Sequence, residues 1–207
     1  MFDQFIESQI SQKRYLLSET FEYNGTDGYD SISTTEIPNL TDSIKNLIIN
    51  GKYGADIIIG WITKKLERIT LYGNDGDDSF DAGFTTGFTA KEAEFFISGN
   101  RGYDTISLSS MLWKRDAITF RRPAQGVTQI IGQNKLDLTP MTVSVSDSVE
   151  SINFFDEINR KFVYYLTEDL AKGITKEVDL NEVVERSYGE KADWYLRGLS
   201  GSSSNTS

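Results

Sequence analysis

Leu71-Tyr72-Gly73-Asn74-Asp75-Gly76-Asp77-Asp78-Ser79-Phe80 contains a skeleton, Gly-x-x-Gly-x-Asp-x-apolar, that occurs four times in the chain. The other three copies run over 25–32, 51–58 and 99–106. In chain order, the first glycines of the four copies are 26, 22 and 26 residues apart. Repetition at such an interval is typical of a fold built by stacking copies of one unit.

Apolar residues recur at fixed positions around each copy of the skeleton. Those four and two residues before the first glycine are Phe21 and Tyr23, Leu47 and Ile49, Ile69 and Leu71, and Phe95 and Ile97. A further apolar residue follows each turn, at Ile32, Ile58, Phe80 and Ile106. Alternation with a period of two predicts a strand with one buried face, and the glycines allow a sharp bend after it. We therefore expect the four residues after the turns to stack in one buried column.

The skeleton resembles the calcium-binding, haemolysin-type nonapeptide of the repeats-in-toxin (RTX) family, with consensus Gly-Gly-x-Gly-x-Asp-x-apolar-x. The resemblance covers residues 21–106. It implies calcium as cofactor and a parallel β-roll as fold. The chain departs from the consensus at its second glycine, which is replaced by Thr26, Lys52, Asn74 and Asn100. It also has one turn per 22 to 26 residues, where the family has two nonapeptides per coil.

The spacing of the aspartates also favours calcium without reference to any family. Strands of a parallel sheet lie about 4.7–4.9 Å apart, so stacked copies would place Asp30, Asp56, Asp78 and Asp104 in a column. Carboxylates at that spacing repel, and Ca²⁺ accepts 6–8 oxygen ligands, whereas Mg²⁺ requires a tighter octahedron. The column offers three gaps, of which the Asp56–Asp78 gap lies in the most acidic surroundings. The alternative is a set of metal-free turns in which each aspartate bonds its own backbone.

The predicted metal site comprises the glycines and aspartates of the four turns. They are Gly25, Asp27, Gly28, Asp30, Gly51, Gly54, Asp56, Gly73, Asp75, Gly76, Asp78, Gly99, Gly102 and Asp104. A weaker copy at 132–139 keeps Asp137 but has Lys135 in place of the second glycine, so we do not expect a full calcium turn there.

Composition excludes several classes of function. The chain has 207 residues, a net charge of −10 and a pI of about 4.6, which argues against nucleic-acid binding because phosphate contacts need clustered lysine and arginine. It contains no cysteine and no histidine, and therefore no disulfide, thiolate metal site or histidine base. No apolar run long enough to span a membrane occurs, and the first residues lack the apolar core of a cleavable signal peptide.

These patterns predict an all-β fold: a right-handed parallel β-helix or β-roll solenoid over residues 1–165. Residues 1–14 would form a helical cap, 21–106 the Gly-x-x-Gly-x-Asp turns, and 107–165 degenerate coils that keep the core and lose the metal. In those coils Val149, Ile152 and Phe154 repeat the strand positions that precede the glycines. Residues 166–197 would form a partly helical C-terminal cap, in which Asp179-Leu180-Asn181-Glu182 is a capping box, and 198–207 a disordered tail.

The function expected from this combination is a non-enzymatic calcium-binding module of an exported bacterial protein. It would fold on calcium binding outside the cell, as part of a toxin, adhesin or surface protein, and a cell-surface glycan or a host protein could be its partner. As an RTX-like protein it would leave the cell through type I secretion machinery, without a cleavable N-terminal signal, and be secreted or held at the cell surface.

Two other functions remain open. One is a polysaccharide-active β-helix enzyme, such as a lyase or epimerase, with Lys64, Lys65, Arg68 and Tyr72 as candidate groups. The other is a sugar-binding adhesin domain in which exposed aromatic side chains stack on sugars; Trp61, Phe84 and Phe88 are its candidates, although burial is the commoner fate of such residues.

Overall fold

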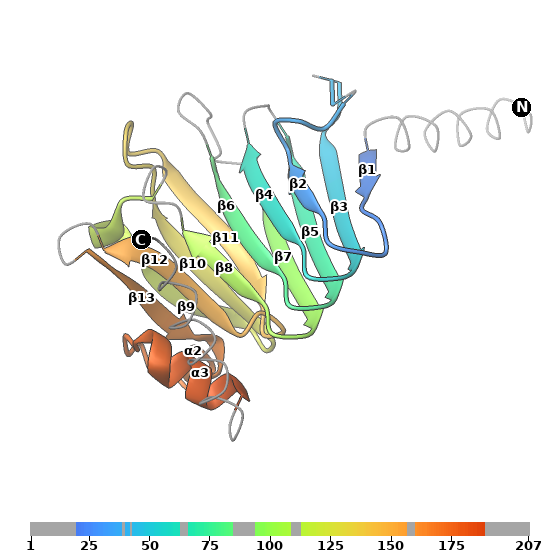
Figure 1. Ribbon diagram of the computed structural model, residues 1–207. Coiled ribbons are helices and arrows are strands. Elements are labelled where there is room, and N and C mark those ends of the chain that lie inside the picture. Colours follow the sequence, from blue (N-terminus) through green and yellow to red (C-terminus); the bar gives the residue numbers. More distant parts are fainter. Residues whose placement is uncertain are drawn as a thin grey trace, which may run out of the picture.

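The computed structural model describes residues 20–38, 40–41, 43–62, 66–84, 94–108, 113–156 and 160–188. The predicted helical cap at 1–14 and the tail at 198–207 lie outside these residues. Across the described residues the chain is mostly β, with one sheet of seven strands and one of six. Figure 1 shows the two sheets, with two helices at the end remote from β1 and β2.

The first eight strands alternate between the two sheets. Sheet A contains β1 (Thr20–Asn24), β3 (Asn46–Tyr53), β5 (Arg68–Asp75) and β7 (Glu94–Arg101); sheet B contains β2 (Ser31–Ser33), β4 (Ile57–Ile62), β6 (Ser79–Phe84) and β8 (Thr105–Leu108). Within each sheet these strands pair in parallel. We call one strand of sheet A, the turn after it and the next strand of sheet B a rung. The four Gly-x-x-Gly-x-Asp copies are the turns of rungs 1 to 4, so the predicted repeat unit corresponds to one rung.

A fifth rung follows after an insertion. Strand β11 (Pro140–Ser146) pairs in parallel with β7, and β12 (Ser151–Asp156) pairs in parallel with β8. A short 3-10 turn at Arg115–Ala117 precedes β9 (Thr119–Ala124) and β10 (Val127–Gln133), which extend sheet A antiparallel, while β13 (Lys161–Leu166) extends sheet B antiparallel to β12.

This arrangement corrects the prediction for residues 107–165. Only β11 and β12 continue the parallel rungs among the described strands of that segment; β9, β10 and β13 are antiparallel. The predicted register is also wrong, because Ile152 and Phe154 pair with Ile106 and Leu108, on the strand after a turn and not before it. Alternating apolar residues fit either sheet equally well, and the pattern therefore could not distinguish the two.

The hydrophobic core lies between the two sheets. Ile32, Ile58, Phe80 and Ile106 are register partners in sheet B and are each at most 4% exposed, which confirms the predicted column. Ile152 continues this column in rung 5 and is fully buried. The opposite wall comes from sheet A, where the paired side chains Leu47, Ile49, Ile69, Leu71, Phe95 and Ile97 are at most 2% exposed.

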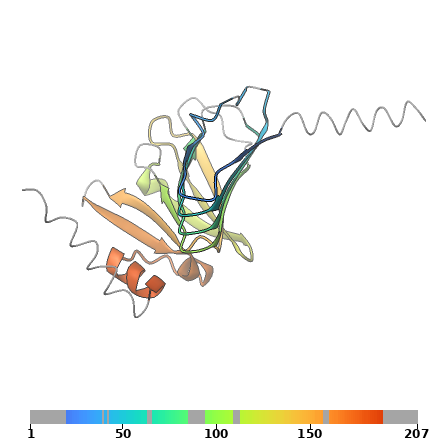
Figure 2. The same ribbon diagram turned by 45° about the vertical axis from the view of Figure 1, so that its right-hand side comes forward.

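Two short helices follow β13. These are α2 (Thr167–Ala171) and α3 (Leu180–Tyr188). The N–H of Glu182 donates to Oδ1 of Asp179 at 3.0 Å, so Asp179 caps α3 as predicted. Val183 and Val184 of this helix are buried, and Figure 2 shows the helices beside β13. Neither helix has the length and apolar character needed to cross a membrane, and no other described segment forms one that does.

Candidate metal centre

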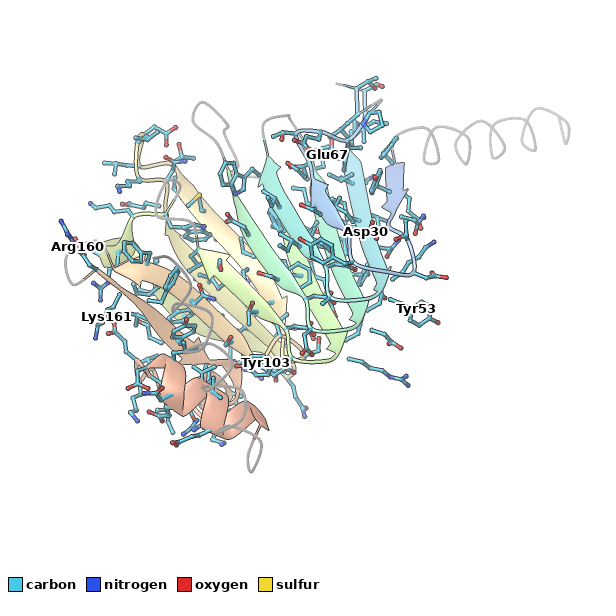
Figure 3. All side chains as sticks on the ribbon, viewed as in Figure 1. Asp30, Tyr53, Glu67, Tyr103, Arg160 and Lys161 are labelled. Carbon is cyan, nitrogen blue, oxygen red and sulfur yellow. The ribbon has the colours of Figure 1, made fainter. Side chains whose placement is uncertain are left out.

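The aspartates of the four turns form one column. Each lies directly before a strand of sheet B, and these strands pair without a shift from rung to rung, so Asp30, Asp56, Asp78 and Asp104 are stacked as predicted. In Figure 3, Asp30, Tyr53 and Tyr103 label the turns of rungs 1, 2 and 4 along this edge. We call these four aspartates, together with Glu150 at the corresponding position of rung 5, the carboxylate column.

One oxygen of each column carboxylate after Asp30 binds the backbone of the preceding rung. The N–H of Asp30 donates to Oδ1 of Asp56, that of Asp56 to Oδ1 of Asp78, and that of Asp78 to Oδ1 of Asp104, each at 2.8 Å. The N–H of Asp104 donates to Oε2 of Glu150 at 2.7 Å. Each carboxylate therefore lies between its own rung and the rung before it, and the ladder ends on Glu150.

The second oxygen differs between rungs. Oδ2 of Asp30 accepts the N–H of Thr26 at 2.6 Å and its hydroxyl at 3.0 Å, which is a bond within its own turn. In contrast, Oδ2 of Asp56, Asp78 and Asp104 is buried and has no hydrogen-bond partner among the described residues. A buried carboxylate oxygen without a donor carries a large desolvation cost. Three of the rungs therefore present an oxygen that a cation or a proton would satisfy.

The glycines of the turns make room for these oxygens. A Cβ on Gly51, Gly73 or Gly99 would overlap Oδ2 of the aspartate of the same rung. The second glycines, Gly54, Gly76 and Gly102, have φ of 117°, 143° and 131°, and a Cβ on each would overlap the backbone of the second glycine of the preceding rung. Each skeleton glycine in rungs 2 to 4 is therefore required by contact with a neighbour.

The consensus departures in turns 2 to 4 share one backbone conformation, from which turn 1 differs. Lys52, Asn74 and Asn100, which stand where the family has its second consensus glycine, adopt left-handed φ values of 83°, 79° and 77°. Asparagine tolerates this region better than most residues. Gly28 has open space around its missing Cβ because no rung precedes it among the described residues.

Backbone carbonyl oxygens lie near two of the column carboxylates, those of Asp30 and Asp56. The position that a Cβ on Gly25 would occupy lies 2.8 Å from Oδ2 of Asp30 and 2.6 Å from the carbonyl oxygen of Gly51. The corresponding position at Gly51 lies 2.8 Å from the carbonyl oxygen of Gly73 and overlaps Oδ2 of Asp56. In rungs 1 and 2 a carboxylate oxygen of the rung and a carbonyl oxygen of the next rung therefore lie near the same glycine. Oxygens of these two kinds are the ligands of Ca²⁺ in proteins.

Electrostatics opposes the charged form of the column. Burial raises the pKa of Asp56, raises that of Asp78 to about 6 and raises that of Asp104 to about 8, from an ordinary value of 3.8. The negative charges of neighbouring column members raise these pKa values further, and the charge of Asp77 also raises those of Asp78 and Asp104, while the backbone N–H bonds lower all three. Burial raises the pKa of Glu150 as well. A bound cation would reverse this balance by stabilising the carboxylates in their charged form.

Two predicted ligands are not brought into the column. Asp27 is exposed, and the 43%-exposed side chain of Asp75 lies with Oδ2 3.7 Å from Nη1 of Arg101. The described residues contain no cluster of three or more His, Cys, Asp and Glu side chains that could hold a metal. Any ion in the column would therefore draw most of its ligands from backbone carbonyls and one or two carboxylates.

Glu150 is the column member that sequence reasoning missed. The turn before it contains no glycine, so no copy of the skeleton marks it. The available signal was Glu150-Ser151-Ile152-Asn153-Phe154, which matches Asp104-Thr105-Ile106-Ser107-Leu108 position by position. Asp77 lies in the turn of rung 3, and its negative charge raises the pKa of Asp78, Asp104 and Glu150, which lie in three successive rungs.

Some of the residues considered for the other two functions lie among the described residues. Arg68 pairs with Glu94 at 2.7 Å on the exposed end of sheet A. Lys64, Lys65 and Phe88 lie outside the described residues. Trp61 packs against the core.

Comparisons with protein-family models, curated proteins and solved structures found no match. The function of this chain is therefore inferred from the column itself.

Proposed function

We propose that this protein is a calcium-binding module of the RTX-like type. Its five rungs would be a short right-handed β-roll, since connections between parallel strands of one sheet are almost always right-handed. The observation that carries the proposal is the set of buried Oδ2 atoms of Asp56, Asp78 and Asp104, which have no hydrogen-bond partner in the part of the chain that the structure describes. One ion beside each of these atoms would satisfy it.

The hydrogen bonds between rungs favour an ion over an ordinary Asx turn. In an Asx turn the carboxylate bonds the backbone of its own turn, and Asp30 does so through Thr26. Asp56, Asp78 and Asp104 instead bond the preceding rung with Oδ1 and keep Oδ2 without a donor. The carboxylate of Asp78 faces rung 2, so we assign it to the Asp56–Asp78 gap alone, and that of Asp104 to the next gap.

Calcium would act as a folding switch. An ion that binds only the folded state adds its binding free energy to folding, and without it the buried carboxylates oppose folding because burial raises their pKa. Where calcium is scarce, as inside a cell, the charged column would destabilise the folded rungs. At the calcium levels found outside cells, bound ions would stabilise the rungs and the chain would fold. This supports a non-enzymatic module of a secreted or surface-held bacterial protein, such as a toxin or adhesin.

The test is thermal unfolding of the full chain with calcium and with excess chelator, followed by circular dichroism. An ion at 100 times its dissociation constant stabilises the folded state by about 2.7 kcal/mol per site, and a chain of this size shifts its midpoint by about 2–4 °C per kcal/mol. Asp78→Ala should reduce the calcium-dependent rise by about one site. Asp137→Ala is the matched control, because Asp137 is exposed in a turn outside the column. Identical melting of the wild type with calcium and with chelator would contradict the proposal.

A further inference from the structure

A polar groove lies on the outer face of sheet B. Its volume is about 430 Å³, within the range of small-molecule sites. The floor carries Ser79, Thr105 and Ser151, which are register partners in rungs 3, 4 and 5. Each directly precedes a core residue of its strand, so its side chain points away from the core. The floor is therefore a row of hydroxyl groups repeated at the spacing of the strands.

The floor contains a polar group that lacks a partner. Ser151 is fully buried, and its Oγ has no hydrogen-bond partner in the described part of the chain. Beside it, the hydroxyl of Ser107 donates to Oδ1 of Asn153 at 2.9 Å. Hydroxyl and carboxamide groups can both donate and accept. An unsatisfied buried hydroxyl in a cavity of this size points to a missing polar occupant.

Aromatic and aliphatic side chains form the wall of the groove. Phe162 is 54% exposed, and its ring lies 5.3 Å from that of Phe155 and 6.4 Å from that of Tyr164. Val183 and Val184 of α3 line the other side. A polar floor opposite an apolar wall suits a ligand with hydroxyls on one edge and C–H groups on its faces.

Charge further restricts the chemistry of the ligand. Among the residues that the structure describes, no lysine or arginine lines the groove, whereas Asp77 and Asp78 lie at its end near the turns. An anion would therefore meet only negative charge. A simple cation has no acceptor atom, so it would leave the hydroxyl hydrogens of the floor without a partner. One oxygen of Asp77 accepts the N–H of Tyr103 at 2.8 Å, and a carboxylate can accept further bonds, including those from ligand hydroxyls.

We propose that this groove binds a neutral saccharide, with a sugar ring against Phe162 and sugar hydroxyls bonded to Ser151, Asn153 and Asp77. The ligand proposed for this groove is different from the ion proposed for the calcium column. It also differs in position from the exposed aromatic residues that the sequence alone suggests for sugar stacking.

The experiment is ligand-observed saturation-transfer NMR on the full chain, with calcium present in every sample. The probes are D-glucose, D-galactose, D-mannose and N-acetyl-D-glucosamine, with D-glucuronate and choline as charged counter-probes. At least one neutral sugar should receive saturation, and both charged probes should receive little. Ser151→Ala and Phe162→Ala should each weaken binding about 2- to 10-fold, the range expected for one hydrogen bond or one ring contact.

Matched controls exist for both variants. Ser31→Ala removes a hydroxyl at the same position of rung 1, and Phe155→Ala removes the neighbouring ring; neither residue lines the groove. Ser151→Ala removes a hydroxyl that bonds no described residue, so this variant should keep the fold even if Phe162→Ala unfolds. The proposal is overturned if no neutral sugar receives saturation, if a charged probe binds as well, or if Ser151→Ala matches Ser31→Ala.

Discussion

Without calcium, the carboxylate column should make the folded protein most stable in acid. Burial raises the pKa of Asp78 to about 6 and that of Asp104 to about 8, while both groups titrate near 3.8 in the unfolded chain. Between the two values the folded state keeps a proton that the unfolded state has released. Stability therefore falls as pH rises. The fall due to Asp78 spans about pH 4 to 6, and that due to Asp104 continues to about pH 8.

The size of the effect can be worked out for Asp78. One pKa unit corresponds to about 1.4 kcal/mol, and the rise from 3.8 to about 6 is therefore worth about 3 kcal/mol. Domains of this kind have total stabilities of only about 5–15 kcal/mol. A loss of this size would lower the thermal midpoint by about 6–12 °C.

Asp78→Asn isolates this contribution. Asparagine cannot ionise, but its carbonyl oxygen can still accept the N–H of Asp56. In chelator at about pH 8 the variant should be more stable than the wild type by up to about 3 kcal/mol. With calcium the order should reverse, because the variant lacks the charged ligand.

The assay is urea unfolding followed by circular dichroism, with chelator and with calcium, at several pH values between about 4 and 8. Asp137→Asn is the control, since it removes an exposed carboxylate outside the column. Wild-type stability in chelator that stays level or increases from pH 4 to 8 would refute the idea that burial opposes the charged column. The same conclusion would follow if Asp78→Asn and Asp137→Asn behaved alike in chelator.

Three further changes test the rungs. Gly76→Ala should lower the free energy of unfolding by at least about 3 kcal/mol, because it adds backbone strain and overlap with the backbone of rung 2. Gly126→Ala, with open space around it, should lower it by about 1–2 kcal/mol in the same denaturation assay. Glu150→Ala should cost about 1–3 kcal/mol of stability, because it leaves the N–H of Asp104 unpaired. Glu150→Gln should cost less, because its side-chain carbonyl oxygen can still accept that N–H. Equal losses for the two variants would contradict this explanation. Ile106→Ala should cost about 2–5 kcal/mol in thermal melts, because Ile106 is fully buried.

The rungs were predictable because their signals are local and repeated. The glycines, the aspartate and the apolar residue after it lie within eight positions, so four copies in one register specify the turn, the column and the core together. This local pattern predicted the part of the carboxylate column from Asp56 to Asp104. It also predicted the buried row of Ile58, Phe80 and Ile106.

The parts of the fold and of the site that the sequence did not predict depend on contacts between segments that are distant in the chain. Nothing near Glu150 indicates that β9 and β10 intervene before rung 5, and a glutamate, with one more methylene than aspartate, reaches the N–H of Asp104 from a turn without glycine. Asp27 and Asp75 have the same local setting as the column residues, yet their side chains lie at the surface of the turns. Residue type and spacing do not reveal which side of a turn a carboxylate faces.

The ladder of carboxylates gives the molecule a direction of assembly. The N–H of the column aspartate in each of rungs 1 to 4 is satisfied by a side-chain carboxylate of the rung that follows it. Rung 5, whose strands are braced by antiparallel neighbours, can thus serve as the template on which rung 4 closes, then rung 3, and so on toward β1. During synthesis the early turns leave the ribosome first, but each must wait for its successor. Folding should consequently run from the last rung back to the first, against the order in which the chain is made.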